Sequence, residues 1–543
     1  MATANEPADP LAKGTLATAK QSFSDLFKWK QRVLVTNELG ESHTEWQAPE
    51  KLRNPISLCR LLRARDWLYF FVGFFAWTAD AFDFHALSIQ TKKLADFYDT
   101  SKTNITTAIT LTLLLRSVGA AIFGLLGDRF GRKWPMVSNM MILGVLQIAT
   151  IYSVTFQQFL AVRSLFGLFM GGVYGNAVAM ALENCPTEAR GLMSGVLQQG
   201  YSFGYVLAAC ASLGVGAGTS TWKIVFWIAA GLSILAGLLR CCFPESRQFR
   251  EAKKANQHVT AGDFWNETKA MLAKEWRLCI YCIILMTWFN YYSHTSQDSY
   301  TTFMIVSKEL DNDGANRASI LMKTGACVGG TIIGYLSQFV GRRRAIVVAA
   351  LISCCMIPAW ILPETERSLS ASGFFMQFFV QGAWGVIPIH LNELSPPAFR
   401  SSFPGLTYQL GTTHPFPSCQ RRGAASFDAN APEKKTGNMI SSPSAQIVNA
   451  IAESHFMRNK KGDIVEAYGP TMGIATAIIA LGIAVTTALG PERRGRSFDV
   501  APVGPRPDVE KGMDAESIAE ARTEKGAEVE EAEKPQVEHK AEA

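Results

Sequence analysis

Long apolar runs alternate with short polar segments along most of the chain. A helix needs about 20 apolar residues to span the hydrocarbon core of a bilayer. Runs of this kind lie at 67–89, 105–127, 134–153, 157–181, 192–215, 224–243, 276–300, 318–339, 345–362, 372–392 and 470–489, and a further, interrupted run begins at 401. The pattern predicts an all-α membrane protein with twelve transmembrane helices.

The apolar region contains an internal duplication. The segment GLLGDRFGRK begins at Gly124, and GYLSQFVGRR begins 210 residues later, at Gly334. The same offset relates ENCPTEARG, which starts at Glu183, to ELSPPAFRS, which starts at Glu393. Several matches at one offset indicate two copies of one unit. The twelve helices are therefore expected to form two pseudo-symmetric halves of six helices each.

Polar segments divide the chain around these halves. The N-terminal half is expected at 66–243 and the C-terminal half at 276–490. We predict a cytoplasmic N-terminal segment at 1–65, a cytoplasmic central loop at 244–275 and a disordered, highly charged cytoplasmic tail at 491–543. The lysines of this tail are candidates for attachment by the ubiquitin machinery.

The charges of the apolar region gather in short loops. DRFGRKW, GRRRA and PERRGR carry dense lysine and arginine on the side that an even number of helices makes cytoplasmic, whereas FMRNKKGD opposes this rule. The formal net charge of +6 therefore reflects orientation in a lipid bilayer, expected to be the plasma membrane, and no nucleic-acid partner is predicted. The eleven cysteines lie mostly within apolar runs, so we expect core residues and neither a metal site nor a cofactor.

The repeated loop residues predict a charge network at the cytoplasmic ends of the two halves. Its candidate gating residues are Asp128, Arg129, Arg132, Glu183, Arg190, Arg342, Glu393 and Arg400. Oppositely charged side chains at pseudo-symmetric helix ends attract one another and keep the two halves together at this end in one conformation of the protein. In the other conformation they separate. In the second copy Gln338 replaces the expected acid, so the two gates should differ in strength. The alternative is that these arginines only anchor the helix ends.

These motifs resemble those of the major facilitator superfamily. The resemblance rests on GxxxDxxGRK between the second and third helices and on the similar ends of the halves, FPESR from Phe243 and GPERR from Gly490. It covers nearly the whole membrane region. It implies a transporter, not an enzyme, with the substrate site at the interface of the two repeats.

A dense polar segment, FNYYSHTSQDSYTTF, follows the apolar part of the seventh run. If the helix continues, Asn290, His294 and Asp298 lie at i, i+4 and i+8 and form one stripe. Ser293 and Gln297 flank this stripe. A single buried asparagine or histidine usually joins two helices. A charge near the bilayer centre costs on the order of 3 kcal/mol, however, so this density of polar groups predicts a hydrated substrate path.

The same segment resembles the signature of the fungal carboxylate/proton symporters, the family of the yeast lactate permease. The matching pattern is Asn290-x-x-Ser293-His294-x-Ser296-Gln297-Asp298-x-x-x-Thr302. The family implies substrates such as lactate and pyruvate, or dicarboxylates such as succinate and malate. By resemblance, Asn290, His294 and Asp298 carry over as residues of binding and translocation, and Ser293 and Gln297 join them as candidates for substrate binding.

A cation for the substrate carboxylate is offered by Arg116, in mid-helix within LTLLLRSVGAA. We predict that Arg116 clamps the carboxylate, and the alternative is a fixed pair with an acid. On the first helix Asp80 and Asp83 lie at i and i+3. The 210-residue offset maps them onto Asn290 and Ser293, which predicts that both stripes face the interface of the halves.

Four groups are candidates for proton coupling: Asp298, His294, Asp80 and Asp83. Burial and neighbouring charges tune a carboxylate or a histidine into the physiological range. Asp298 is the first choice among them. A purely structural role for Asp80 or Asp83, including a pair with Arg116, is an equal alternative.

Residues on two further helices are predicted to set specificity. Gln409 and Asn438 of the eleventh helix are candidate amide donors for a second substrate oxygen. Phe203 and Tyr201 of the fifth helix are a candidate size filter, and the alternative for Phe203 is ordinary core packing.

The eleventh helix is interrupted by an anomalous insert at 412–437. It holds three prolines and several charges without an apolar face, so it cannot lie in hydrocarbon as a helix. Its removal joins Gly411 to Asn438 and restores a normal span. We interpret the insert as an intron that was not removed or an error in the gene structure, and a regulatory loop is the weaker alternative.

The combined prediction is a proton-coupled importer of short carboxylates that works by alternating access. The nearest alternative substrates are dicarboxylates. A facilitator for a neutral substrate such as a sugar is another alternative, although it would not need Arg116 or the stripe with His294 and Asp298. A carboxylate sensor without net transport is the alternative from another class.

Overall fold

The computed structural model describes most of the chain between residues 16 and 493. The described residues are 16–28, 30–36, 42–47, 51–100, 102–216, 218, 220–245, 261–396, 399–412, 448, 451–452, 454–458 and 464–493. Asn438, the insert beyond Thr412 and the predicted tail beyond Arg493 lie outside these residues.

Helices occupy the predicted spans, because lipid offers the backbone no hydrogen-bond partners and a helix satisfies its own. The N-terminal half contains α4 (Ala64–Ile89), α6 (Lys102–Phe130), α7 (Lys133–Tyr152), α8 (Phe156–Met170), α9 (Val173–Glu183), α10 (Arg190–Gln198), α11 (Gly200–Val215) and α12 (Trp222–Cys242). The C-terminal half contains α14 (Ala261–Gln297), α15 (Tyr300–Val306), α16 (Asn312–Val340), α17 (Arg342–Ile361), α18 (Glu366–Leu394), α19 (Ser402–Thr412) and α21 (Tyr468–Leu489). The eleventh span is thus described as helix only in its first part, α19.

Short elements lie outside these spans. They are the helices α2 (Leu16–Leu26), α3 (Pro55–Leu61) and α5 (Thr91–Phe97), and the strands β1 (Gln31–Thr36), β2 (Ser42–Gln47), β3 (Phe456–Arg458) and β4 (Ile464–Glu466). The strands form two antiparallel hairpins, β1 with β2 and β3 with β4, which the apolar pattern did not predict. Two-stranded hairpins leave unpaired edges, so their place outside the bilayer is expected.

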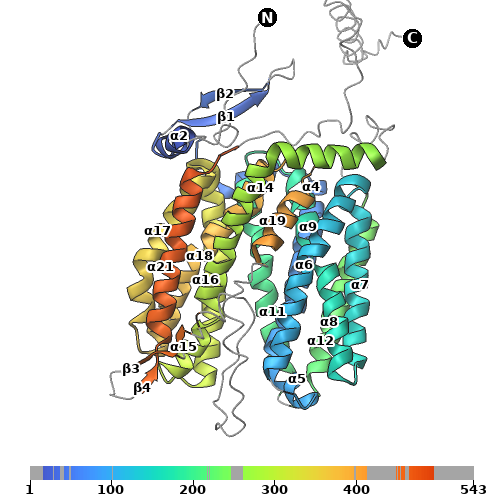
Figure 1. The fold of residues 1–543 in the computed structure, drawn as a ribbon, viewed down its shortest axis with the longest axis vertical. Coiled ribbons are helices and arrows are strands. Elements are labelled where there is room, and N and C mark those ends of the chain that lie inside the picture. Colours follow the sequence, from blue (N-terminus) through green and yellow to red (C-terminus); the bar gives the residue numbers. More distant parts are fainter. Residues whose placement is uncertain are drawn as a thin grey trace, which may run out of the picture.

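The two halves form two helix bundles that stand side by side (Figure 1). The internal duplication also appears in the backbone of the repeated loops. Gly131 has φ 98° and Gly341, 210 residues later, has φ 108°. These left-handed conformations favour glycine, and they let the chain reverse between consecutive helices within a very short turn.

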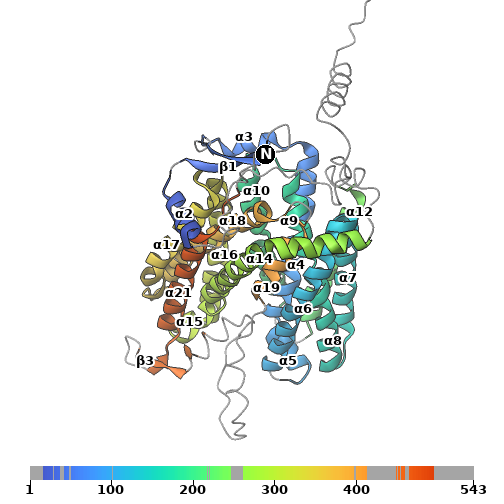
Figure 2. The same ribbon diagram turned by 45° about the horizontal axis from the view of Figure 1, so that its top comes forward.

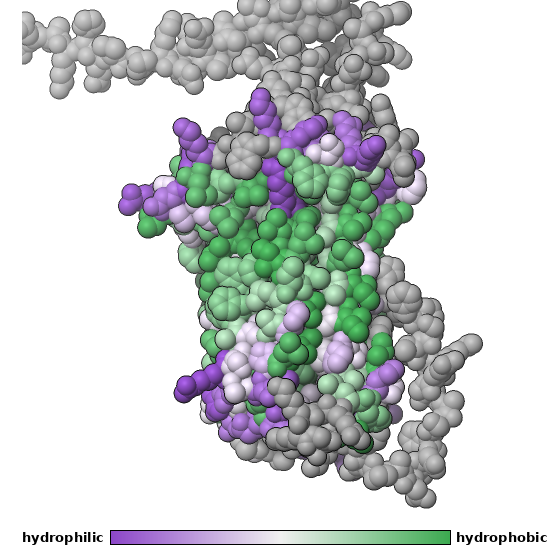
Figure 3. Space-filling model, turned by 90° about the vertical axis from the view of Figure 1, so that its left-hand side faces the viewer, coloured by the Kyte–Doolittle hydropathy of each residue, from purple (hydrophilic) through white to green (hydrophobic). Residues whose placement is uncertain are grey.

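A hydrophobic band lies between two polar ends on the face of the molecule shown in Figure 3. On the face formed by α17 and α21, the exposed side chains include Val348, Leu351, Ile352, Ile478 and Leu481. Among the described residues, eight helices are long and apolar enough to cross a membrane. Exposed aliphatic side chains in a continuous band are what a lipid environment requires.

The seventh span begins earlier than predicted. α14 starts at Ala261, within the segment expected to be a loop, and its backbone leaves helical geometry at Glu275. The first part of α14 lies across one end of the bundles, as Figures 1 and 2 show. Trp265, Leu272 and Trp276 are exposed on this part. Tryptophan at this position is typical of a helix at a membrane–water interface.

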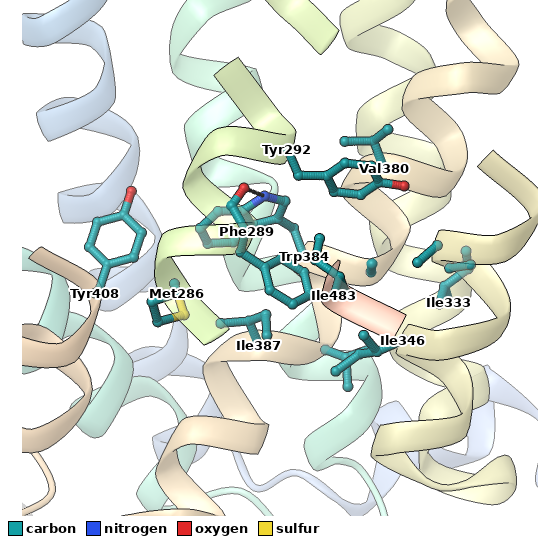
Figure 4. Close-up of a cluster of buried hydrophobic side chains, with 14 of the residues drawn as sticks. Met286, Phe289, Tyr292, Ile333, Ile346, Val380, Trp384, Ile387, Tyr408 and Ile483 are labelled. Carbon is teal, nitrogen blue, oxygen red and sulfur yellow. Dashed lines mark hydrogen bonds between the residues drawn. The ribbon is translucent and has the colours of Figure 1, made fainter. Parts of the chain in front are cut away.

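One face of α14 enters the core of the C-terminal half (Figure 4). Phe289 and Tyr292 are fully buried there, and the indole of Trp384 donates a hydrogen bond of 3.2 Å to the carbonyl of Phe289. The hydroxyl groups of Tyr292 and Ser353 form a second link, to α17. This packing fixes the rotation of α14, and with it the direction of the polar stripe on its other face.

Candidate functional site

Equivalent buried arginine–glutamate pairs lie in the two halves, at the end of the bundle that carries Arg132 and Arg342, called here the basic end. Nη1 of Arg132 lies 2.5 Å from Oε2 of Glu183. Nε and Nη2 of Arg342 each donate a hydrogen bond of 3.2 Å to the carboxylate of Glu393. The two pairs occupy equivalent positions in the duplication. The structure thus brings together four of the residues predicted as a gate.

Asp128 connects the two halves at the basic end. Its carboxylate oxygens accept hydrogen bonds of 2.8 and 2.9 Å from the backbone N–H groups of Ser401 and Ser402, at the start of α19. Arg132 also donates a bond of 3.1 Å to the hydroxyl of Ser401. A carboxylate at a helix N-terminus satisfies free N–H groups and interacts well with the helix dipole.

The second copy of this loop is built differently. Oε1 of Gln338 accepts a hydrogen bond of 2.8 Å from Nη2 of Arg342, within its own half. An amide is uncharged, so it cannot reproduce the interaction of Asp128 with a helix N-terminus. This difference is consistent with the predicted inequality of the two gates.

Small residues let the halves approach closely at the basic end. A Cβ atom at Gly124 would lie 2.6 Å from Cα of Ser402, and one at Gly334 would lie 2.6 Å from Cα of Gly195. These are equivalent contacts, of α6 with α19 and of α16 with α10. Such close backbone approach is typical of tight helix pairs in membranes.

The remaining gate candidates lie nearby. Nε of Arg190 donates a hydrogen bond of 3.2 Å to the carbonyl of Cys185. Arg400 is fully buried beside the Asp128 contact, and Arg129 lies 4.9 Å from the ring centroid of Phe130. Arg190 therefore supports its own loop, and Arg129 packs on an exposed aromatic ring.

The polar stripe of α14 continues as predicted, through Asn290, His294 and Asp298. Nδ1 of His294 lies 2.9 Å from Oδ2 of Asp298. The amide of Asn290 is buried and donates to the carbonyls of Met286 and Tyr408, at 2.9 and 3.4 Å. The structure therefore joins the two ionisable members of the stripe into one pair and ties Asn290 to α19.

Ser293 and Gln297 belong to a hydrogen-bonded chain that crosses three helices. Nε2 of Gln297 and Nε2 of Gln381 both donate to the hydroxyl of Ser293, at 2.9 and 3.0 Å. Oε1 of Gln297 accepts a hydrogen bond from Nζ of Lys323 on α16. The chain therefore ends on a buried ammonium group that was not among the predicted site residues.

Arg116 lies close to an acid, as the alternative interpretation allowed. Its Nη2 is 3.8 Å from Oδ2 of Asp80, and both side chains are buried. Nε and Nη2 of Arg116 and both carboxylate oxygens of Asp80 lack a hydrogen-bond partner among the described residues. Buried polar groups are nearly always satisfied, so this site has unused capacity to bind a polar ligand.

Asp83 lies away from this site, although the sequence predicted that it shares a face with Asp80. Its carboxylate accepts hydrogen bonds from Ser233 on α12 at 2.7 Å and from Gln147 on α7 at 3.4 Å. Nη1 of Arg163 donates to the same Gln147 at 2.7 Å. Residues at i and i+3 point about 60° apart around a helix axis, and this is enough to direct Asp83 into the packing of its own half.

Aromatic rings lie among the charges of the two halves. The ring centroid of His85 is 4.8 Å from that of Tyr201 and 5.1 Å from that of Tyr205. Tyr408 of α19 stacks on Tyr174 of α9, with centroids 4.4 Å apart. Asp298, Arg116 and Asp80 all lie within electrostatic range of Tyr201, so the pair on α14 and the pair on α4 and α6 both lie near this ring.

The predicted specificity residues have different surroundings. Phe203 is 44% exposed and stacks on Phe74, with centroids 6.4 Å apart, so it is not one of the rings around His85. Gln409 is buried, and its backbone carbonyl accepts a hydrogen bond of 3.1 Å from the hydroxyl of Ser117, the residue after Arg116. Asn438 lies outside the described residues.

Lys323 is the main site residue that sequence reasoning missed. It lies in the eighth apolar run, within ILMKTGACVGG, and is buried. An ionisable residue inside a span is by itself a signal of function, and it was available in the sequence. The described residues contain no group of three or more histidine, cysteine, aspartate or glutamate side chains suited to a metal ion.

The comparisons with known proteins agree with this architecture. A carboxylic acid transporter protein homolog of Saccharomyces cerevisiae is 34% identical over 376 residues, which cover 66% of this chain and 61% of the relative. The chain thus spans less than two thirds of that relative. A probable 4-methylmuconolactone transporter of Cupriavidus pinatubonensis is 22% identical over 63% of this chain and 79% of the relative.

The solved structure of the proton:xylose symporter XylE, bound to 6-bromo-6-deoxy-D-glucose, has the same fold. It is 14% identical, covers 80% of this chain and 98% of its own, and superposes with a TM-score of 0.58. The proteins found are transporters, which confirms the prediction that this chain is not an enzyme. The family model described as Major Facilitator Superfamily matches residues 67–412, so the chain belongs to the major facilitator superfamily.

Proposed function

We propose that this protein is a proton-coupled symporter that imports short-chain monocarboxylates, of the lactate and pyruvate type, across the plasma membrane. The main support is the His294–Asp298 pair, with Nδ1 and Oδ2 2.9 Å apart. Asp298 and Arg116 both lie near the rings of His85, Tyr201 and Tyr205, called here the aromatic cluster. A titratable pair supplies the proton site, and a buried guanidinium supplies the carboxylate site. The name of the yeast relative, a carboxylic acid transporter, supports the same substrate class.

Proton coupling follows from the charge of the substrate. A monocarboxylate that enters with one proton adds no net charge to the closed cavity, whereas either species alone leaves an uncompensated charge in a low dielectric. The cavity therefore switches with both ligands or with neither. Import is then driven by the pH gradient, at about 1.4 kcal/mol per pH unit.

Alternating access requires the halves to part at one end at a time. We propose that the basic end is cytoplasmic and that Asp128, with the Arg132–Glu183 and Arg342–Glu393 pairs, forms its gate. The bonds from Ser401 and Ser402 to Asp128 support a state that is closed at this end. Release of substrate into the cell then requires these bonds to break.

Within the site, Arg116, Asn290 and Gln409 are proposed to hold the carboxylate. We propose Tyr201 and Tyr205 as the size filter in place of Phe203, because their rings contact His85. A dicarboxylate preference stays the nearest alternative. Competition by glucose but not by lactate would favour a facilitator for neutral substrates, and binding of labelled lactate without accumulation would favour a sensor.

The experiment that tests this function is initial uptake of labelled lactate by cells that lack their own permease. It compares the full chain with a chain from which residues 412–437 are removed, at acidic and neutral external pH. We expect uptake by the shortened chain, rising in acid, because Gly411 then continues directly into Asn438. Absence of uptake from a chain shown at the cell surface, with lactate, pyruvate, succinate and malate alike, would contradict the proposal.

A further inference from the structure

Lys323 is a buried cation that no part of the proposed mechanism uses. It lies on α16, in the C-terminal half, and only a small fraction of its surface is exposed. Among the described residues its ammonium group donates one hydrogen bond, to Oε1 of Gln297, although an ammonium has three donors. A buried ammonium is costly unless it is paired or binds a ligand.

Lys323 also reaches across the interface of the halves. Its Nζ lies 4.8 Å from the ring centroid of Tyr205, on α11 of the N-terminal half. The ring of His85 contacts Tyr205 and interacts electrostatically with both Lys323 and Arg116. One buried imidazole is therefore within range of a cation from each half.

The fixed charges of the membrane interior balance in pairs. Arg116 lies 3.8 Å from Asp80. Lys323 interacts electrostatically with Asp298, although no ion pair joins them in the described structure and the carboxylate of Asp298 contacts the imidazole of His294 instead. Lys323 is therefore the counter-charge of Asp298 at longer range. When a proton neutralises Asp298 or is held by His294, the ammonium of Lys323 is free to interact with an anion.

We propose that Lys323 is a second cationic anchor for the substrate carboxylate, so that Arg116 of one half and Lys323 of the other hold the anion between them. This inference rests on the proposed carboxylate transport. Because each half would contribute one cation to the same ligand, a bound anion would draw the two halves together and close the cavity. This role also makes Lys323 a determinant of the preference for anions over neutral compounds of equal shape.

Variants of Lys323 in the full chain test this role. Binding is measured as the stabilisation of the purified protein against heat by lactate, and again by lactamide, its uncharged amide. We expect Lys323→Met to weaken lactate binding by roughly 10- to 100-fold, the effect of losing one charge-assisted bond, and to leave lactamide binding nearly unchanged. Lys323→Arg should retain most of the preference for lactate, and Lys274→Met, on the exposed part of α14, should change neither.

Two comparisons separate ligand binding from a structural role. If Lys323 only positions Gln297, then Gln297→Leu and Lys323→Met will weaken lactate and lactamide binding to the same degree, and the inference is wrong. If Lys323 only balances Asp298, then the double variant Lys323→Met with Asp298→Asn will restore lactate binding, and the inference is again wrong. Failure of every carboxylate to stabilise the unchanged protein would instead contradict the proposed function.

Discussion

Nδ1 of His294 lies 2.9 Å from Oδ2 of Asp298, one turn further along α14. The two side chains are 19% and 23% exposed, whereas those of Asn290 and Gln297, on the same helix, are buried. Water therefore reaches the pair more easily than it reaches the amides. A group that exchanges protons with solvent needs such access, so the pair is the best placed of the candidates to carry the coupled proton.

Replacing Asp298 by asparagine should uncouple transport from the pH gradient. The substitution keeps the shape of the side chain and removes its charge and its ability to bind a proton. We expect uptake of lactate driven by external acid to fall to the background level, while exchange of labelled for unlabelled lactate across the membrane persists. The measurement compares acid-driven uptake with exchange in the same cells.

Acid-driven accumulation that survives in Asp298→Asn would move the proton site to another group. Asp80 is then the next candidate, because it faces Arg116 with both carboxylate oxygens free of hydrogen bonds among the described residues. The same assay on Asp80→Asn would identify it.

Arg116→Gln should abolish carboxylate transport, because the main cation of the N-terminal half is lost. The change leaves Asp80 as a buried acid without its counter-ion, and breaking such a pair costs about 3–5 kcal/mol of stability. The double variant with Asp80→Asn removes both charges and should recover the amount of folded protein but not the uptake. Uptake by the double variant would show that Arg116 serves only as a partner of Asp80.

Asp83→Asn should reduce stability with little effect on substrate affinity. Asp83 accepts hydrogen bonds from Ser233 and Gln147 inside the N-terminal half, away from the aromatic cluster. Weakening hydrogen bonds to a buried charge costs roughly 1.5–3 kcal/mol. The melting temperature and the KM for lactate, measured on the same preparation, check this separation, and a large rise in KM at unchanged melting temperature would place Asp83 in the substrate path.

Asp128→Asn should loosen the basic end. Asp128 accepts hydrogen bonds directly from the N–H groups of Ser401 and Ser402, so hydrogen–deuterium exchange at these two amides reports the contact. We expect their exchange to accelerate about 10-fold or more, as loss of the charge weakens both bonds. Unchanged exchange would mean that the close contact at Gly124 holds the gate by packing alone.

The matched variant Gln338→Asp makes the opposite change in the second copy. It restores the acid that the duplication predicts, opposite the start of α10. A carboxylate near that helix N-terminus should stabilise the closed gate, so transport should slow while lactate affinity stays within about twofold. Faster transport would contradict the interpretation of Gln338 as a weakened gate.

The apolar pattern and the 210-residue offset were sufficient for the architecture. Lipid leaves the backbone no alternative to helices, so a run of apolar residues identifies a span by itself. A constant offset likewise identifies equivalent positions, and this is why a charge network containing Arg132, Glu183, Arg342 and Glu393 could be expected. The pairing of each arginine with the glutamate of its own half was not predicted. The helical period also predicted the stripe from Asn290 to Asp298.

The contacts of individual side chains could not be predicted from the apolar pattern or the offset. The spacing of Asp80 and Asp83 predicted one shared face, but packing against α7 and α12 takes Asp83 out of the site. On the fifth helix Phe203 and Tyr201 were predicted as site residues, and Tyr205 was passed over. Only the rotation of α11 in the bundle brings Tyr205 to His85 and Lys323.

The sequence by itself determined the membrane spans and their division into two equivalent halves. It also showed that charged residues lie within the spans, where their energetic cost indicates a function. The tertiary structure decided which charges meet, because the rotation of each helix is set by neighbours that lie far away in the chain. Lys323 belongs to α16, and Gln297 and Asp298 belong to the end of α14. The contact of Lys323 with Tyr205, on α11 of the other half, arises only when the two bundles pack together.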